Sequence, residues 1–599
     1  MVYRVKQKWS RLVKGGNGKI AQQFGIDPVT ATVLLNREIN EEDRIRTFLY
    51  GGLEDLADPR RMDQAMEAVS LLHDAVAANK KIRIFGDYDA DGIFSTCILY
   101  HTLDKAGGCV SYDIPDRVTD GFGMSKRMVE QAFHDKVSLI ITCDNGITQT
   151  EEVLLAKKLG MTVIVTDHHE ANYKTDASGM RQYILPEADA VVDPKKPGCS
   201  YPDKELCGAG VVWKLMYLFE MLYIEGRELP VDQCRIAMEN LPFAAAATVT
   251  DVMKLTGENR ILVKKGLELL PKTENAGMQA LIRSCALSDR PLTTTHVGFV
   301  LGPCLNASGR LKTALDAVSL LLETDPVKAS RKAEQLKQLN DMRKEMTEDG
   351  KAAAFEKITG SSLIHDRVLC VYLEGIHESV AGIIASKVKE TFFRPVLIFT
   401  DTQDPALLKG SGRSIEPYNM HDELSAVSDL MVRFGGHAMA AGVTIERSSL
   451  DTLRSRINEI CALTPDDLTQ KVLLDAVIPF SYLSEPLIEE LAGLEPFGPG
   501  NRAPLFGCSK VQVLSLRILG KNQNCVKLSV TDGSRRMTAV YFGDANAFLQ
   551  YIKDTWGEAE TAKLMMGQPN QVRLSLAYRP VINEFRSERS IQLQIAHFQ

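Results

Sequence analysis

The sequence predicts a multidomain α/β protein in which a parallel sheet is followed by a long connecting helix, a smaller α/β unit and a β-barrel. Between residues 81 and 192, short apolar stretches alternate with helical stretches of about ten residues, which is typical of a doubly wound sheet. From Val327 onward a long helical run carries charges of both signs. Beyond Asn501, five alternating strand-like stretches fit within about a hundred residues, which suits a small barrel of the OB type.

Length and composition agree with a soluble protein of several domains. The chain has 599 residues, enough for roughly three or four domains of about 150 residues. Its 45% hydrophobic and 25% charged residues are those of globular proteins, and no apolar run reaches the about 18 residues of a membrane span. The basic N-terminus lacks the apolar core of a secretory signal. Twelve cysteines occur without a CxxC pair, so we expect reduced thiols in a cytoplasm.

The charge is distributed unevenly along the chain. The net charge is −7, but residues 501–599 carry 13 Lys and Arg against 7 Asp and Glu. This segment is therefore basic (+6) and the remainder acidic (−13), which suits polyanion binding in one place and metal binding in another. Chance scatter is the alternative explanation.

We expect five segments in order. Residues 1–75 form an N-terminal helical segment, 76–325 a parallel-sheet catalytic domain, 326–365 a connecting helix, 366–465 a second α/β domain, and 466–599 a linker and barrel. In the second segment the strands are expected at 81–85, 110–114, 138–142, 161–165 and 190–192, and the helices at 93–106, 125–134 and 150–159. In the fourth, strands are expected at 368–373 and 395–400, and in the barrel at 511–516, 525–530, 537–542, 572–577 and 591–595.

Three carboxylates follow the first strand of the sheet. Asp87, Asp89 and Asp91 alternate in the sequence GDYDADG, directly after Lys81–Phe85. Clustered carboxylates repel one another unless cations share the site, and hard divalent cations prefer oxygen ligands. An exposed acidic turn or a helix N-cap explains this stretch alone equally well.

The next strands also end in metal-binding residue types. Asp144 follows the strand at 138–142, and Asp167, His168 and His169 follow the strand at 161–165. Because the carboxyl ends of parallel strands meet at one edge, where ligands of open sheets bind, these side chains should converge. The sequence therefore predicts a metal site there. Asp251, after the small-residue run AAAATVT, is either a helix cap or a further ligand.

Two later motifs favour contacts with an oxyanion. Arg310 lies in PCLNASGR, which we interpret as a turn. Ser411, Gly412, Arg413 and Ser414 lie in GSGRS, and His437 lies in FGGHAMAAG. Glycine-rich turns with arginine offer backbone donors and a bidentate cation to a phosphate. Many glycine turns only solve backbone geometry, so both interpretations stand.

Basic and aromatic residues interleave in the predicted barrel. Lys521, Lys527, Arg535 and Arg536 alternate with Tyr541 and Phe542. Basic grooves with aromatic side chains hold single-stranded nucleic acid through phosphate charge and base stacking. Alternatively, the aromatic rings belong to the barrel core and the cations are ordinary surface residues.

Taken in order, DYDADG, CDNG, TDHHE and TVTDV resemble the motifs of the DHH phosphoesterase superfamily, and GSGRSI with FGGHAMAAG resembles its DHHA1 domain. Together with PCLNASGR, HESVAGIIASKV, EPFGPGN and a terminal barrel, the chain is similar to the RecJ family of single-strand-specific 5′-to-3′ DNA exonucleases. The similarity covers nearly the whole chain after about residue 45. It implies hydrolysis of single-stranded DNA to 5′-mononucleotides in recombination and repair, with two divalent ions, Mn²⁺ or Mg²⁺.

The resemblance also implies roles for individual residues. Catalytic roles fall to His169, His168, Asp144 and His437. The 5′ phosphate is contacted by Arg310, Ser411, Gly412, Arg413 and Ser414. The implied metal ligands are Asp87, Asp89, Asp91, Asp144, His168 and Asp251. Several DHH enzymes have a histidine where this chain has Phe85, so which of the first three aspartates bind metal directly is left open.

Two other functions are the alternatives. A phosphodiesterase for short oligoribonucleotides or cyclic dinucleotides would need no basic barrel after the DHHA1 unit, and a non-catalytic scaffold would lack some of the acidic and histidine motifs. We therefore expect an exonuclease that acts as a monomer on single-stranded DNA, with a single-strand-binding protein and a helicase as protein partners and without a membrane.

Overall fold

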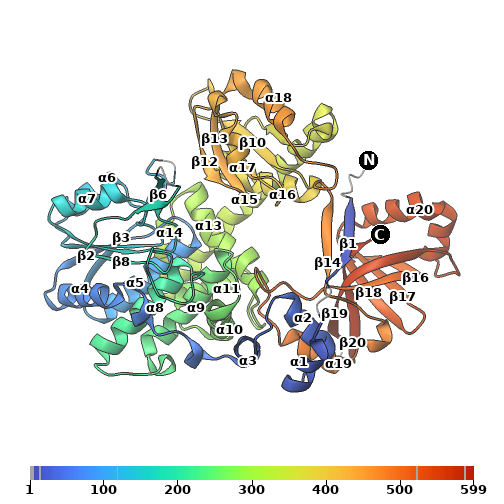
Figure 1. Cartoon of the computed structure of the whole chain (residues 1–599), viewed down its shortest axis with the longest axis horizontal. Coiled ribbons are helices and arrows are strands. Elements are labelled where there is room, and N and C mark those ends of the chain that lie inside the picture. Colours follow the sequence, from blue (N-terminus) through green and yellow to red (C-terminus); the bar gives the residue numbers. More distant parts are fainter. Residues whose placement is uncertain (1–5, 13–14, 118, 177–178, 521–523, 586–587) are drawn as a thin grey trace. The chain divides into compact units, whose positions relative to one another are not determined.

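The computed structural model describes residues 6–12, 15–117, 119–176, 179–520, 524–585 and 588–599. The chain divides into two compact units, whose elements are labelled in Figure 1. The parallel-sheet unit comprises residues 46–346 and 496–501, and the barrel unit comprises residues 1–45, 347–495 and 502–599. Across the described ranges, no helix combines the length and the apolar character needed to cross a bilayer.

A five-stranded sheet organises the parallel-sheet unit, in the order β3-β2-β4-β5-β8 with all neighbours parallel. The predicted doubly wound sheet is therefore confirmed. Each strand is placed within two residues of its expected bounds. These strands are β2 (Lys81–Phe85), β3 (Cys109–Asp113), β4 (Leu139–Cys143), β5 (Thr162–Thr166) and β8 (Ala190–Val192).

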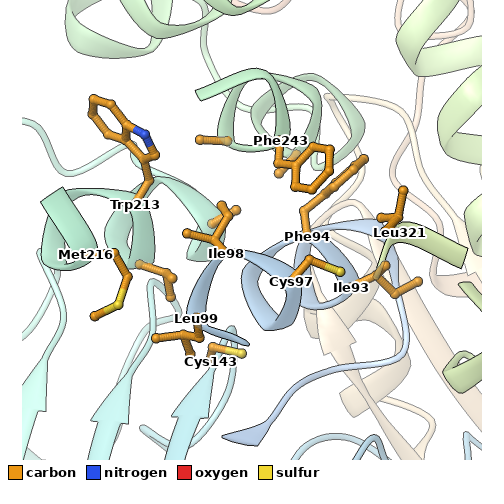
Figure 2. Close-up of a cluster of buried hydrophobic side chains, with 14 of the residues drawn as sticks. Ile93, Phe94, Cys97, Ile98, Leu99, Cys143, Trp213, Met216, Phe243 and Leu321 are labelled. Atoms are coloured by element: carbon orange, nitrogen blue, oxygen red, sulfur yellow. The ribbon is translucent and has the colours of Figure 1, made fainter. Parts of the chain in front are cut away.

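Both faces of this sheet are buried, as parallel sheets require. Along β4, Leu139, Ile141 and Cys143 join one hydrophobic core, whereas Ile140 joins the core on the other face. Figure 2 shows part of the first core, in which Phe94 packs 5.4 Å from Phe243 between ring centroids. Because α5 (Ala90–Lys105) is covered on nearly every side, its buried residues form a continuous run rather than a stripe.

Helices surround the sheet and complete the unit. α6 (Lys126–His134) and α7 (Thr150–Lys158) contribute to the second core, and α4 (Ala65–Ala77), α5 and α8 (Gly208–Phe219) to the first. The remaining α-helices of the unit are α3 (Glu42–Tyr50), α9 (Arg235–Thr250), α10 (Gly257–Leu269), α11 (Ala276–Ser284), α12 (Thr294–His296), α13 (Gly302–Leu311) and α14 (Leu315–Leu321). A two-stranded hairpin, β6 (Asn172–Thr175) with β7 (Arg181–Ile184), follows β5.

The 34-residue helix α15 (Pro326–Thr359) links the two units along the chain, near the bounds predicted for it. Beyond it lies the sheet β12-β13-β11-β10-β9, in which only β9 and β10 are parallel. Its elements are β9 (Leu369–Tyr372), α16 (Glu378–Phe392), β10 (Val396–Asp401), β11 (Leu407–Arg413), α17 (Met420–Ser425), β12 (Arg433–His437), β13 (Ala440–Glu446) and α18 (Leu450–Ile460).

The last part of the chain forms the predicted barrel. Its order is β15-β16-β17-β18-β20-β19, and an additional pairing of β16 with β19 closes the sheet. Two helical stretches joined by a kink at Gly557 (φ 84°) make up α20 (Ala545–Met565), which lies between β18 and β19 and was not predicted. The other elements are α19 (Glu485–Ala492), β15 (Ala476–Val477), β16 (Phe506–Leu519), β17 (Cys525–Thr531), β18 (Arg536–Phe542), β19 (Arg573–Phe585) and β20 (Glu588–Phe598).

The N-terminal segment differs from the helical arm that we predicted for residues 1–75. Residues 7–11 form a strand, β1 (Gln7–Arg11), which pairs in parallel with β14 (Gln470–Leu474). The following α1 (Asn17–Phe24) and α2 (Pro28–Asn36) belong to the barrel unit, where Asn36 Nδ2 donates to the carbonyl of Asp475 at 3.1 Å. The prediction missed β1 because its partner lies more than 450 residues away.

Candidate metal centre

The loop between β2 and α5 presents its three aspartates in different ways. Asp89 caps α5, and its Oδ1 accepts the N–H groups of Asp91 and Gly92 at 3.0 and 3.3 Å. Asp91 is buried, and its two oxygens accept N–H groups at the start of α8, at 2.7 and 2.8 Å. Asp87 is also buried, and its Oδ1 has no hydrogen-bond partner in the described part of the chain. Among the three, Asp87 therefore has the acceptor most in need of a cation.

The ends of β4, β5 and α9 bring three further ligand types to this loop. Nε2 of His168 lies 3.1 Å from Oδ1 of Asp144, which follows β4 in a left-handed conformation (φ 62°). The same nitrogen lies 3.7 Å from Oδ2 of Asp91 and of Asp251, the C-cap of α9. Four segments far apart in the sequence thus meet at the carboxyl edge of the sheet.

Three overlapping groups of these side chains have ligand atoms within 4.8 Å of one another. Asp144 and His168 each belong to two of these groups, so the groups overlap. The structure thus brings together all six residues that the family resemblance implies as metal ligands. The groups are Asp144, His168 and His169; Asp91, His168 and Asp251; and Asp87, Asp89 and Asp144.

Unsatisfied buried atoms test whether cations fit these positions. Oδ1 of Asp87, Oδ1 of Asp144 and both ring nitrogens of His168 are buried without a hydrogen bond in the described residues. The 3.1 Å contact between His168 and Asp144 does not meet hydrogen-bond geometry, so it leaves both atoms unsatisfied. Buried polar groups without partners are costly, and carboxylate and imidazole donors suit Mn²⁺ and Mg²⁺. The residues present therefore fit divalent cations.

Electrostatics agree with that fit. Burial and the neighbouring carboxylates raise the pKa of Asp144 well above its usual range, and raise the pKa of Asp91 to about 6 and of Asp251 to about 8. Burial, together with the charge of His169, lowers the pKa of His168 to about 3, which keeps its imidazole neutral as a ligand. Cations at this edge would favour ionised carboxylates and remove the repulsion.

His169 is held by the carboxylate of Asp167, which the sequence analysis expected at this edge without assigning it a role. Burial opposes protonation of His169, but Oδ1 of Asp167, 2.7 Å from Nδ1, raises the pKa of the imidazole to about 9. Asp167 is fully buried and also accepts the N–H groups of His168 and Ile147. Its position directly after β5 was the same signal that singled out the two histidines. The ring of Phe122 lies edge-on to His169, with centroids 5.3 Å apart.

The predicted phosphate-binding residues occupy regular elements rather than turns. Arg310 lies in helix α13, so the interpretation of PCLNASGR as a turn was wrong. Ser411, Gly412 and Arg413 lie in strand β11, and the exposed His437 ends strand β12. A glycine on the neighbouring helix lies close to this strand, because a Cβ on Gly382 of α16 would lie 2.8 Å from Nη2 of Arg413.

Ser414 does not fit a role in phosphate binding. It is fully buried, its N–H donates to the carbonyl of Met439 at 2.9 Å, and its hydroxyl donates to the carbonyl of Tyr418 at 2.6 Å. Both donors are therefore used within the domain.

The barrel residues fall into separate environments. Lys527 is exposed on β17, and Arg517, which sequence reasoning missed, is its exposed register partner on β16. Arg536 is also exposed and donates to Oγ of Ser529 at 2.7 Å, whereas Arg535 donates to the carbonyl of Leu483 at 2.8 Å. Lys521 lies outside the described residues.

The two barrel aromatics also differ. Tyr541 packs against Phe548 and Phe598, with ring centroids 5.6 and 5.3 Å apart. This agrees with the alternative interpretation, in which the aromatic rings belong to the barrel core. Phe542 is 66% exposed.

Comparison with known proteins gives the class first. The DHH family N-terminal domain model matches residues 81–240, and the DHHA1 domain model matches residues 365–463. The first match covers the Asp and His cluster except Asp251, and the second covers the sheet with Arg413 and His437. The chain thus carries a DHH domain followed by a DHHA1 domain, which is the domain pair of the DHH phosphoesterase class.

The remaining matches define the family. The RecJ OB domain model matches residues 474–597. The chain is 33% identical over 578 residues to the single-stranded-DNA-specific exonuclease RecJ of Bacillus subtilis, spanning 96% of this chain and 68% of the relative. It is 34% identical to RecJ of Salmonella typhimurium, spanning 88% and 89% of the two chains. The crystal structure of Thermus thermophilus RecJ with Mn²⁺ matches with a TM-score of 0.79 and 25% identity, over 99% of this chain and 80% of that chain. The chain belongs to the RecJ family.

Proposed function

We propose that this protein is a metal-dependent exonuclease that hydrolyses single-stranded DNA from the 5′ end and releases 5′-mononucleotides in recombination and repair. The observation that carries the proposal is the convergence of Asp and His side chains with unsatisfied buried atoms at one sheet edge of a RecJ-family chain. The polarity comes from the family resemblance alone.

The proposed metal ligands are the six residues that meet at this edge, with His168 and Asp144 shared between two positions. Bound divalent cations, Mn²⁺ or Mg²⁺, supply an acidified water and charge neutralisation at the scissile phosphate. The ligands are Asp87, Asp89, Asp91, Asp144, His168 and Asp251.

His169 is the proposed proton-holding group beside the metals. With a pKa of about 9 and Nδ1 toward Asp167, its imidazole is protonated at neutral pH. Its side chain is 41% exposed, so it can approach a substrate. We assign it stabilisation of charge on the phosphate or on the leaving oxygen, with Asp167 fixing the orientation of the ring.

The other predicted contacts are proposed as substrate grips. Arg310, Ser411, Gly412 and Arg413 are assigned to phosphates, and His437 to a catalytic role near the scissile phosphate, as the family resemblance implies. Ser414 is left out. In the barrel, exposed Lys527 and Arg536 are assigned to the DNA backbone, with Arg535 contributing its remaining donors.

We propose domain limits of 76–325 for the catalytic domain, 326–365 for the connecting helix, 366–465 for the second α/β domain, and 466–599 for the linker and barrel. The N-terminal segment keeps its limits of 1–75, except that residues 1–45 belong with the barrel unit. We further propose that the protein works in the cytoplasm as a monomer, with a single-strand-binding protein and a helicase as partners.

Digestion of end-labelled single strands tests the function. Strands blocked at the 3′ end should be degraded with Mn²⁺, strands blocked at the 5′ end should persist, and chelator should stop the reaction. Asp144→Ala and His168→Ala should abolish digestion while DNA binding is retained. Full activity in both variants would contradict the catalytic assignment of Asp144 and His168.

The alternative substrate class is a dinucleotide or cyclic dinucleotide. The barrel favours the longer substrate, because an enzyme for short substrates would need no basic barrel after the DHHA1 unit. A turnover comparison of a dinucleotide with a long 5′-phosphorylated strand decides between them, and faster turnover of the dinucleotide would overturn our proposal.

A further inference from the structure

Two cysteine thiols lie in contact inside the parallel-sheet unit and have no role in the function proposed above. Cys285 follows α11 as its C-cap, and Cys304 lies in the first turn of α13. Their Sγ atoms are 3.8 Å apart, and both cysteines are free thiols. Because the two residues are 19 positions apart in the sequence, a bond between them would join the end of one helix to the start of another.

The two thiols differ in their access to solvent. Cys285 is half-buried, and the turn that follows it is largely exposed, beginning with Ala286 in a left-handed conformation (φ 54°). Cys304 is fully buried, and its Sγ accepts the side-chain N–H of Asn340 at 3.4 Å. A dissolved oxidant therefore meets the sulfur of Cys285 before that of Cys304.

The surroundings also favour the thiolate on Cys285. The contact with Cys304 lowers the pKa of the Cys285 thiol against the opposite effect of burial, and the charges of Lys337 and Lys344 lower it further. The same contact, together with burial, raises the pKa of Cys304. Because the thiolate and not the thiol is the nucleophile, Cys285 is the sulfur that attacks an oxidant.

A disulfide requires the two sulfur atoms to approach by about 1.8 Å, to the bond length of about 2.05 Å. The α13 side is held in place by the loop that carries the metal-site aspartates. Oδ1 of Asn306 accepts the N–H of Ala90 at 2.7 Å, and a Cβ on Gly309 would lie only 2.5 Å from the carbonyl oxygen of Tyr88. We therefore expect the exposed turn at Cys285 to move, while α13 keeps both contacts.

We propose that Cys285 and Cys304 form a reversible oxidation site for hydroperoxides, in which Cys285 reacts first and Cys304 resolves the product. The Cys285 thiolate attacks the outer oxygen of the hydroperoxide and the O–O bond breaks. The alkoxide leaves and takes up the proton that Cys285 had released, which gives an alcohol and a sulfenic acid. The sulfur of Cys304 then attacks that of Cys285, the S–O bond breaks, and hydroxide leaves with the Cys304 proton as water. The two thiols lose two electrons, and the hydroperoxide gains them.

The disulfide has two consequences for this part of the protein. It fastens α13 to the end of α11 and so holds the helix against the loop that carries the metal-site aspartates. It also stops oxidation at a reversible stage, because an unresolved sulfenic acid on Cys285 proceeds to a sulfinic acid that a dithiol does not reduce. If the two thiols instead only fill space as small apolar side chains, neither consequence is expected.

Treatment of the full-length, Mn²⁺-loaded protein with hydrogen peroxide tests the proposal, with peptide mapping under non-reducing conditions as the readout. In wild type the peptides of Cys285 and Cys304 should be joined, with a loss of about 2 Da, and a dithiol should separate them. Cys109→Ser, which removes an exposed thiol elsewhere, should give the same joined peptides. Wild type without joined peptides, under conditions that oxidise Cys109, would overturn the proposal.

Single variants separate the roles of the two thiols. In Cys304→Ala, peroxide should leave Cys285 about 32 Da heavier, as a sulfinic acid that a dithiol does not reverse. In Cys285→Ser, Cys304 should stay unmodified. An unmodified Cys285 in Cys304→Ala would contradict its role as the reacting thiol. If Cys304→Ala does not fold, Cys304→Ser replaces it.

Thermal unfolding and Mn²⁺ titration test the holding role. Oxidised wild type should unfold about 5 °C above the reduced protein, because the cross-link restricts the unfolded chain, and Cys285→Ser should show no such rise. Mn²⁺ affinity should be the same in the oxidised and reduced protein. A disulfide that forms without the rise, or that lowers Mn²⁺ affinity, would refute the holding role. These measurements do not use DNA digestion, so a failure of the proposed function is distinguishable from a failure of this proposal.

Discussion

Replacement of Gly208 by alanine tests the geometry of the metal centre, because it adds a single methyl group beside Asp144. Gly208 begins α8, and its N–H donates to Oδ2 of Asp91 at 2.7 Å. A Cβ at this position would lie 2.6 Å from Cβ and 2.9 Å from Cα and Cγ of Asp144. Non-bonded carbons prefer about 3.5–4.0 Å, so Asp144 or the start of α8 must move by about 1 Å.

The movement has a calculable consequence. Asp144 cannot rotate away, because its Cα is among the atoms that the new methyl group meets. Misplacement of a reacting group by about 1 Å can lower the rate about 100-fold, and overpacking lowers the free energy of unfolding by about 1–3 kcal/mol. We therefore expect Gly208→Ala to weaken Mn²⁺ binding and to lower turnover by about two orders of magnitude while the protein stays folded.

Gly210 provides a matched control on the same helix. The nearest atoms to a Cβ there, Cβ and Cδ2 of Leu206, lie at 3.5 Å, an ordinary contact. Gly210→Ala should therefore match wild type in three measurements. These are the initial rate on a labelled single strand at saturating Mn²⁺, the Mn²⁺ affinity from titration, and the free energy of unfolding in urea. Wild-type Mn²⁺ affinity and turnover in Gly208→Ala, or equal impairment of both variants, would refute the reasoning.

Four further predictions concern the site and the barrel. Mn²⁺ affinity should rise between pH 6 and 8, because Asp91 (pKa about 6) and Asp251 (pKa about 8) must lose protons to bind it, and a flat titration profile would count against them. Over the same interval the metal-free protein should lose thermal stability, since a carboxyl group whose pKa is raised by folding stabilises the fold only while protonated. His169→Ala should lower kcat about 10²- to 10⁴-fold with Mn²⁺ affinity retained, and an unchanged kcat would remove its assigned role. Arg517→Gln with Lys527→Gln should reduce the salt dependence of single-strand binding by a slope of about 1.4, and an unchanged slope would exclude these two contacts.

The sheet and its edge could be predicted because local patterns determine them. Short apolar strands alternate with helices, and in parallel sheets the residue that follows each strand lies at a known edge. The same rule places Asp87, Asp144 and His168 together. It also applies to Asp193, which follows the three-residue strand β8.

Features that depend on distant packing could not be predicted in this way. The glycines of GSGRS suggested a turn, yet a Cβ on Gly410 would lie 2.6 Å from the ring of Phe399 on the neighbouring strand. These glycines are needed for close packing inside a sheet, and local rules do not distinguish that use from a turn. Strand β1 and the buried hydroxyl of Ser414 depend on partners that the sequence alone does not identify.

Equilibrium titration of the chelator-treated protein with Mn²⁺ tests the central claim most directly. Wild type should bind two equivalents per chain, and His168→Ala, which removes the donor that lies between Asp144, Asp91 and Asp251, should lose at least one of them. Absence of saturable Mn²⁺ binding by wild type, or two undiminished equivalents in His168→Ala, would contradict the account.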